Sequence, residues 1–130
     1  MGVGTKFTMN ALQVPTAYST YPVTGSDAST TLDSSQASDE VYDVWGYDLW
    51  AVGATTVNFK SGATDRSGDL VVPQAGNLWW QPPVGSRLQQ QNALPRVQTI
   101  AGGNLVLTNS NAVGLTGVVW ANKRKANLNI

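Results

Sequence analysis

Apolar and polar residues alternate along much of the chain with a period of two. In residues 56–60 and 104–108 every second position is apolar, so that Val57 and Phe59 share one face of the first segment. Successive side chains of a β-strand point to opposite faces, and the pattern therefore indicates strands with one buried face. Residues 116–121 are apolar on both faces, which predicts a central strand or a strand covered by a partner chain.

The expected strands are rich in Val, Thr, Trp and Tyr and are separated by Gly, Asn, Ser and Pro, as is typical of all-β domains. We expect strands at 41–52 with a break or bulge near Gly46, and at 55–60, 70–72, 77–81, 96–100, 104–108 and 114–122. Residues 86–93 could form a helical turn, which Pro95 would end. The fold class that follows is all-β, a single sandwich of jelly-roll-like form over residues 39–122.

Residues 1–38 form a different segment. They lack helical periodicity, contain Pro15 and Pro22, and end in a run of Ser and Thr. Because few apolar side chains could be buried there, we expect an extended N-terminal arm. Two alternatives stay open for this arm: a solvated tail, or a segment that reaches a neighbouring subunit. At the other end, residues 123–130 are expected to form a basic C-terminal tail.

The charged residues balance in number but not in position. The 130 residues include eight Lys and Arg, and eight Asp and Glu. A neutral single domain argues against a general nucleic-acid or membrane-surface binder. All acidic residues lie between Asp27 and Asp69, whereas Lys123, Arg124 and Lys125 belong to a basic half. This gradient predicts either attraction between copies or neutralisation within one subunit.

The chain has no Cys and no His. Disulfides, zinc-thiolate sites, thiol nucleophiles and the commonest general base are therefore excluded, and we expect no enzyme, no cofactor and no catalytic or metal-binding residue. Asp65 and Asp69 flank a turn that could hold Ca²⁺, but Asp in such turns more often accepts hydrogen bonds from its own backbone. A paired-carboxylate hydrolase is the remaining enzymatic alternative. Without a membrane span or signal peptide in the sequence, we expect a soluble chain, made in a cytosol and complete from Met1.

Five Trp residues mark candidate contact surfaces, with Trp45 near Trp50 and Trp79 next to Trp80. Trp79 and Trp80 must point to opposite faces of a strand, so we expect one in the core and the other exposed or covered by a neighbouring subunit. The alternatives are local packing of both rings against the prolines that follow, and a sugar-stacking platform of Trp and Asp.

Two segments carry a resemblance to a known family. Val57 to Thr64 reads VNFKSGAT, and Ala101 to Val119 reads AGGNLVLTNSNAVGLTGVV. These segments resemble small virion proteins of tailed bacteriophages, in which a strand of the type V-x-F-x-S-G-x-T and a late strand pair recur in one short β-domain. The resemblance covers residues 41–122, and the double Trp and the N-terminal arm depart from it. It implies a decoration or cement protein that binds the outside of an icosahedral shell in many copies, and it carries over no catalytic residue.

The resemblance leads us to expect a homo-oligomeric cement subunit on the capsid exterior of a virion, made in the host cytoplasm. Its partners would be the major capsid protein and other copies of itself, with no direct contact to nucleic acid or membrane. The residues expected at its interfaces are Trp45, Trp50, Trp79, Trp80, Trp120, Lys123, Arg124 and Lys125. The alternative is a glycan- or receptor-binding module of a phage tail fibre or baseplate, in which Trp side chains would stack on sugar rings.

Overall fold

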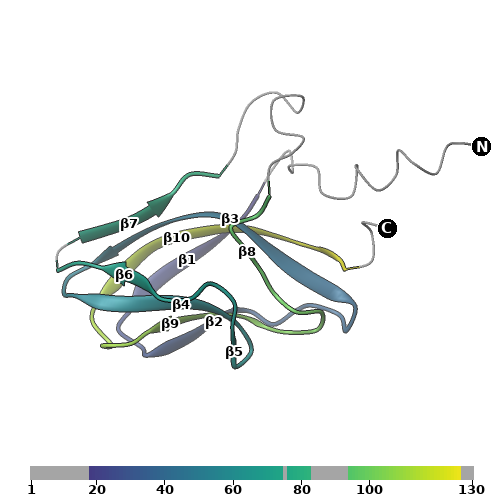
Figure 1. Cartoon of the computed structure of the whole chain (residues 1–130), viewed down its shortest axis with the longest axis horizontal. Helices are drawn as coiled ribbons and strands as arrows, with labels where there is room; N and C mark the ends of the chain where they lie inside the picture. The colour runs from purple at the N-terminus through teal and green to yellow at the C-terminus, as the bar shows by residue number, and fades with distance from the viewer. Residues whose placement is uncertain (1–17, 75, 83–93, 127–130) are drawn as a thin grey trace, which may run out of the picture.

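The computed structural model describes residues 18–74, 76–82 and 94–126, which form two antiparallel β-sheets packed face to face (Figure 1). In sheet A the strand order is β1 (Ser19–Gly25), β10 (Leu115–Lys125), β3 (Glu40–Ala51) and β7 (Gly76–Trp80), and the short β8 (Val97–Gln98) pairs with the same edge of β3 as β7. In sheet B the order is β2 (Ser29–Asp33), β9 (Leu105–Asn109) and β4 (Thr55–Ser61), and both β5 (Thr64–Asp65) and β6 (Leu70–Val72) pair with the far edge of β4. The expected all-β sandwich is confirmed.

The strand pairs are nested along the chain. The first strand, β1, pairs with the last, β10, and β2 pairs with β9. Inside these pairs, β3 pairs with β7 and β8, and β4 with β5 and β6. The described chain is thus a two-stranded antiparallel ribbon that passes back and forth between the two sheets.

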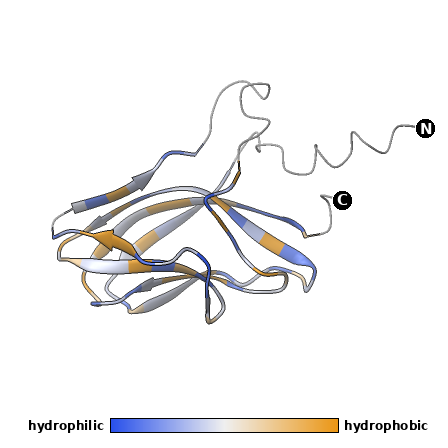
Figure 2. Ribbon diagram, in the orientation of Figure 1, coloured by the Kyte–Doolittle hydropathy of each residue, from blue (hydrophilic) through white to orange (hydrophobic). Residues whose placement is uncertain are grey.

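The core lies between the sheets. Along β4 buried and half-buried residues alternate, and Val57 and Phe59 have no exposed surface, as the sequence pattern predicts. From sheet A, Tyr47 packs its ring 5.3 Å from that of Phe59. Hydrophobic and hydrophilic bands are visible along β4 (Figure 2). The two-residue period therefore directs one set of side chains from each sheet into a shared apolar layer.

A β-bulge interrupts the pairing of β3 with β10. Trp120 lies opposite Gly46, but the next residue, Ala121, lies opposite Val44, so that Trp45 is the extra residue. The bulge that the sequence predicts near Gly46 is confirmed. Gly46 is required here because the chain leaving β7 crosses over it: an added Cβ would lie 2.5 Å from Cδ of Pro82. Only a residue without a side chain permits this approach.

The expectation that residues 1–38 form an arm is wrong for residues 19–33, which form β1 and β2. Both are edge strands, and an edge strand needs few buried side chains because only part of one face is covered. In β1 only Val23 is buried. The backbone pairing of β1 with β10 and of β2 with β9 therefore holds segments whose composition is typical of a loop. Residues 1–17 lie outside the described residues.

The expectation of a basic tail from residue 123 is also wrong in part, because β10 continues to Lys125 and pairs along β3 as far as Glu40. The other expected strands are present with boundaries shifted by a few residues, and β5 is additional. The possible helical turn at residues 86–93 lies outside the described residues. Within the described ranges, no helix is long and apolar enough to span a membrane.

Candidate interaction surface

Around residues 47–51 of β3, sheet A buries one face and exposes the other. Along β3, Tyr47, Leu49 and Ala51 are buried in the core. Because side chains alternate along a strand, Asp48 and Trp50 between them point away from the core. Trp50 is 49% exposed. A large aromatic side chain thus stands on the outer side of a central strand.

The register identifies its neighbours on the outer side, because residues directly opposite each other on antiparallel strands share a face. Asp48 lies between Val118 of β10 and Trp79 of β7, and Pro22 of β1 lies beyond Val118. Trp120 faces the same side, one row further along β10. We call these outward apolar side chains the aromatic face: Pro22, Trp50, Trp79, Val118 and Trp120.

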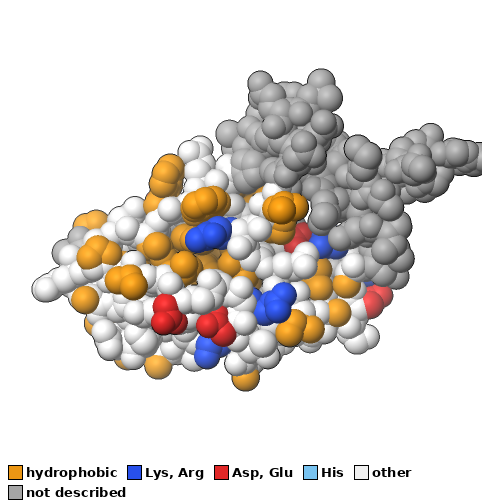
Figure 3. Space-filling view, in the orientation of Figure 1, with side chains coloured by type: hydrophobic (Ala, Val, Ile, Leu, Met, Phe, Trp, Pro, Cys, Tyr) orange, Lys and Arg blue, Asp and Glu red, His pale blue; other side chains and the backbone are white. Residues whose placement is uncertain are grey.

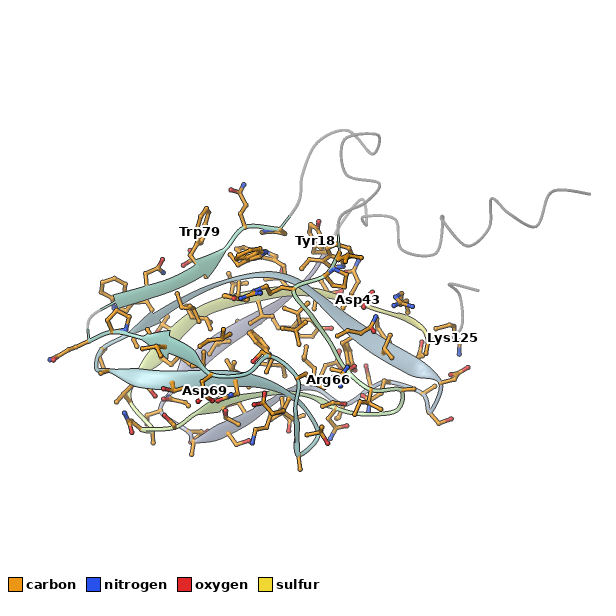
Figure 4. All side chains as sticks on the ribbon, in the orientation of Figure 1. Tyr18, Asp43, Arg66, Asp69, Trp79 and Lys125 are labelled. Carbon is orange, nitrogen blue, oxygen red and sulfur yellow. The ribbon has the colours of Figure 1, made fainter. Side chains whose placement is uncertain are left out.

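The aromatic face is accessible at the β7 edge. Trp79 is 57% exposed, and its ring projects away from the sandwich (Figure 4). In the space-filling view, apolar side chains gather along the β7 side of the molecule with a basic side chain among them (Figure 3). Grouped apolar side chains on a surface mark contact sites, whereas single exposed ones need no explanation.

A polar pair lies within the aromatic face. Asn77 stands opposite Trp50, just as Trp79 stands opposite Asp48. The Asn77 amide nitrogen Nδ2 donates to Oδ1 of Asp48 at 2.6 Å and to the Leu49 carbonyl at 3.1 Å. The two Trp side chains and the Asp48–Asn77 pair therefore occupy opposite diagonals of one four-residue patch. Carboxylate and amide groups in this position can hydrogen-bond to a ligand that lies on the rings.

Trp79 and Trp80 point to opposite faces of β7, as expected, but neither is a core residue. Trp80 is on the core side, opposite Tyr47, yet it remains 47% exposed. Its place at the end of an edge strand leaves one side of the ring uncovered by the sandwich. The Arg96 guanidinium lies 4.6 Å from the Trp80 ring centroid, within cation–π range, and Nε of Arg96 approaches the Tyr47 hydroxyl at 3.4 Å.

Trp45 has a different environment from the other Trp residues. Only 2% of its surface is exposed, and its ring centroid lies 6.4 Å from that of Tyr18. Trp45 therefore contributes to packing within the subunit and offers no surface to a partner in this conformation.

The three basic residues expected at an interface have partners within the chain. Nε of Arg124 lies 2.6 Å from Oδ2 of Asp43, a carboxylate that is almost fully buried and also accepts from Gln98. The Lys125 ammonium is 3.0 Å from Asp39, and Lys123 donates to Ser35. Acidic residues from the N-terminal half and basic residues from the C-terminal half thus meet within one subunit, because β10 pairs with β3.

Asp65 and Asp69 act as hydrogen-bond acceptors within the chain. Oδ1 of Asp65 accepts from the backbone N–H groups of Ser67 and Gly68, and the Asn58 amide donates to both carboxylates. The Asp65 carboxylate therefore accepts hydrogen bonds from the backbone of its own turn, which is the alternative to the calcium site considered above. Among the described residues, no three Asp or Glu side chains are grouped so that they could hold a metal ion.

A partly buried hydrogen-bond network joins β1, β2 and β3. The Tyr21 hydroxyl donates to Oδ2 of Asp33 at 2.8 Å, and the backbone N–H of Ser35 donates to Oδ1. Burial would raise the pKa of the Asp33 carboxyl, but the hydrogen bonds from Ser35, Tyr21 and Tyr42 outweigh it and lower this pKa to about 2. Burial and the same carboxylate raise the pKa of Tyr21. The network stabilises the carboxylate form and fixes β2 to sheet A.

The outer face of sheet B has a different character. A shallow hollow of about 440 Å³ is lined by small and hydroxyl side chains and by Lys60. It holds no group of aromatic side chains, and its members come from β2, β4, β9 and the adjoining turns. Of the two outer faces, the aromatic face of sheet A is therefore the better candidate for recognition.

The sequence indicated the Trp residues, but it did not indicate which of their neighbours complete the surface. Asp48 and Asn77 lie 29 positions apart, and only the β3–β7 register brings them together. The detectable signal was the alternation in Tyr47–Trp50, which places Asp48 and Trp50 on one face. No family model, curated protein or solved structure matches this chain.

Proposed function

We propose that this protein is a structural component of a virion, a decoration or cement subunit that binds the exterior of a phage capsid through the aromatic face. The observation that carries the proposal is this face itself, with three Trp side chains on one side of sheet A. Two of them, Trp50 and Trp79, are about half exposed. Enriched Trp at the centre of a surface is a hallmark of residues that dominate binding energy between proteins.

The strand order supports a jelly-roll form of the sandwich. Pairing of β1 with β10, β2 with β9, β3 with β7 and β4 with β6 is what results when one long antiparallel ribbon is wound into two sheets. Jelly rolls occur in viral capsid proteins and in lectins. A fold alone does not assign a function, so this order is compatible with capsid decoration and with glycan binding alike.

Internal charge pairing favours an apolar mode of attachment. Arg124 and Lys125 pair with Asp43 and Asp39 of the same chain, and these charges are then less available to a partner. Attachment through the aromatic face would depend on burial of Trp rather than on ion pairs. High salt should leave such attachment unchanged or strengthen it.

Co-sedimentation with empty capsids tests the proposal. We expect wild-type protein to saturate the particles in many copies, and Trp79→Ala to reduce occupancy strongly because it removes an exposed ring at the accessible edge of the face. Val71→Ala is the matched control, since Val71 is also exposed, at 69%, but belongs to β6 of sheet B. Absence of capsid binding by the wild type, or equal loss in both variants, would contradict the proposal.

A second candidate is a glycan-binding module of a tail fibre or baseplate. The patch in which Trp50 and Trp79 flank the Asp48–Asn77 pair favours it, because Trp rings stack on sugar rings while carboxylate and amide groups bind hydroxyls. Titration with oligosaccharides at micromolar to millimolar concentration tests this function. Saturable binding that is lost in Asp48→Ala, together with no binding to capsids, would favour the second candidate over the first.

A further inference from the structure

The outer edge of β7 is free among the described residues. Sheet A ends at β7, which pairs on one side with β3. The opposite end of the sheet, β1, contains Pro22, which limits pairing with a further strand. In contrast, β7 reads Gly-Asn-Leu-Trp-Trp and has neither a proline nor a charged side chain. An edge of this kind is a template for another strand.

The register determines which backbone groups of β7 face outward. Beyond the end of β3, the N–H of Val52 donates to Gly114 on the β10 side. The backbone N–H and C=O groups of successive residues alternate in direction. Those of Asp48 and Trp50 therefore also point towards β10, whereas those of Tyr47 and Leu49 point towards β7. Leu78 is paired with Leu49, so the backbone N–H and C=O groups of Leu78 point towards β3. The N–H and C=O groups of Asn77 and Trp79 consequently point away from the sheet.

We propose that two copies of this protein pair through their β7 strands, antiparallel and about a two-fold axis at Leu78. In this register Asn77 of each copy lies opposite the partner copy's position 79, and all four outward groups of each strand are used in four N–H to C=O hydrogen bonds. A two-fold axis makes the interface self-complementary, as is usual in homodimers. Such pairing adds a mode of self-association to the proposed function and does not depend on attachment to a capsid.

The side chains of β7 fit this register. Trp80 of one copy would lie beside Gly76 of the other, which has no side chain of its own. Pro73 covers Gly76 from its own chain, because an added Cβ there would meet the Pro73 ring at 2.5 Å. The ring of Trp80 would then pack on a proline ring, and the Arg96 guanidinium of its own chain already lies 4.6 Å from the centroid of that Trp ring. Aromatic side chains beside an edge glycine are a recurrent cross-strand arrangement.

The exposed area limits how much surface the dimer can bury. Trp79 and Trp80 are 57% and 47% exposed, and a Trp side chain has up to about 250 Å² to bury. Even if their exposed surface were buried completely, the four rings of a dimer would contribute about 500 Å², and the backbone edges and Leu78 add less than this. Since stable interfaces bury at least about 1,200 Å² in total, we expect a weak dimer, with a dissociation constant in the micromolar to millimolar range.

Cysteine cross-linking tests the register directly, because the chain has no native Cys. In the proposed dimer the two Leu78 residues are directly opposite each other in a non-hydrogen-bonded pair, at a Cβ separation suited to a disulfide. Leu78→Cys should therefore form a disulfide-linked dimer rapidly under mild oxidation. Ile100→Cys is the control for random collision, since Ile100 is 46% exposed and lies outside β7. Equal rates in the two variants would overturn the proposal.

A pair of substitutions at Asn77 tests the edge hydrogen bonds. Asn77→Ala and Asn77→Pro both lose the amide that binds Asp48, but only Pro removes the outward N–H. Sedimentation equilibrium should show a dissociation constant at least about tenfold higher for N77P than for N77A. Equal constants, or no dimer of the wild type at about 1 mM, would refute the pairing. If circular dichroism shows N77P to be unfolded, the cross-linking rates alone decide between pairing and no pairing. None of these measurements involves capsids, so their outcome is independent of the proposed attachment.

Discussion

Replacement of Arg124 by Gln should destabilise the fold far more than the same replacement of its neighbour Lys125. Asp43 is 3% exposed, and its side chain is held by Arg124 at 2.6 Å and by Gln98 at 2.9 Å. Without the guanidinium, a buried carboxylate keeps one neutral donor. Breaking a buried ion pair by removing one partner costs about 3–5 kcal/mol, and we expect about 3 kcal/mol because the Arg124 side chain is still 14% exposed.

Lys125 provides the matched control. Its ion pair with Asp39 joins side chains that are 48% and 56% exposed, and exposed pairs contribute little to stability. In a domain of this size, about 3 kcal/mol corresponds to a fall in Tm of roughly 10 °C for Arg124→Gln, against no measurable change for Lys125→Gln. Urea unfolding followed by Trp fluorescence gives both free energies. Equal and negligible effects would show that the basic triplet is a free surface feature and that the pairing with Asp43 contributes nothing.

Three further perturbations test other parts of the fold. The folded-state pKa of Asp33 is about 2, below its unfolded value of 3.8. The carboxylate therefore contributes stability above pH 4 that is lost as the pH falls towards 2. Asp33→Asn should remove this part of the acid dependence in urea titrations, a change of no more than about 1 kcal/mol after solvent screening. Gly46→Ala should reduce stability by more than about 2 kcal/mol, since its Cβ would meet Pro82 and the Trp80 carbonyl; unchanged Tm would disprove the close crossing. Phe59→Ala removes a fully buried ring and should cost about 3–5 kcal/mol in the same assay.

The sequence predicted strands well where a strand has one buried face. Val57 and Phe59 alternate with polar residues, and β4 follows this pattern to within one residue. It was uninformative for β1, because an edge strand with only Val23 buried has the composition of a loop. Its pairing with β10 depends on residues about a hundred positions away, which no local pattern records.

The candidate surface was predictable to a similar degree. That Trp79 and Trp80 point to opposite faces follows from strand geometry alone. The exposure of Trp80 follows instead from the position of β7 at a sheet edge, which is a property of the topology. The pairing of Arg124 with Asp43 likewise depends on the β3–β10 register. The sequence of the basic triplet is typical of a solvated tail, but its residues belong to a strand.

The nested pairing of strands also constrains the order in which the chain can fold. β4 pairs with β5 and β6, its near neighbours in sequence, and this meander closes only short loops. Each outer pair needs a longer loop closure, up to Ser19 with Ala121, and the entropic cost of closure grows with loop length. Folding is therefore expected to begin at the meander and to proceed outwards, slowly, as in other domains dominated by non-local contacts. During synthesis β1 leaves the ribosome first but receives its partner last, so the sandwich can be completed only after β10 has emerged.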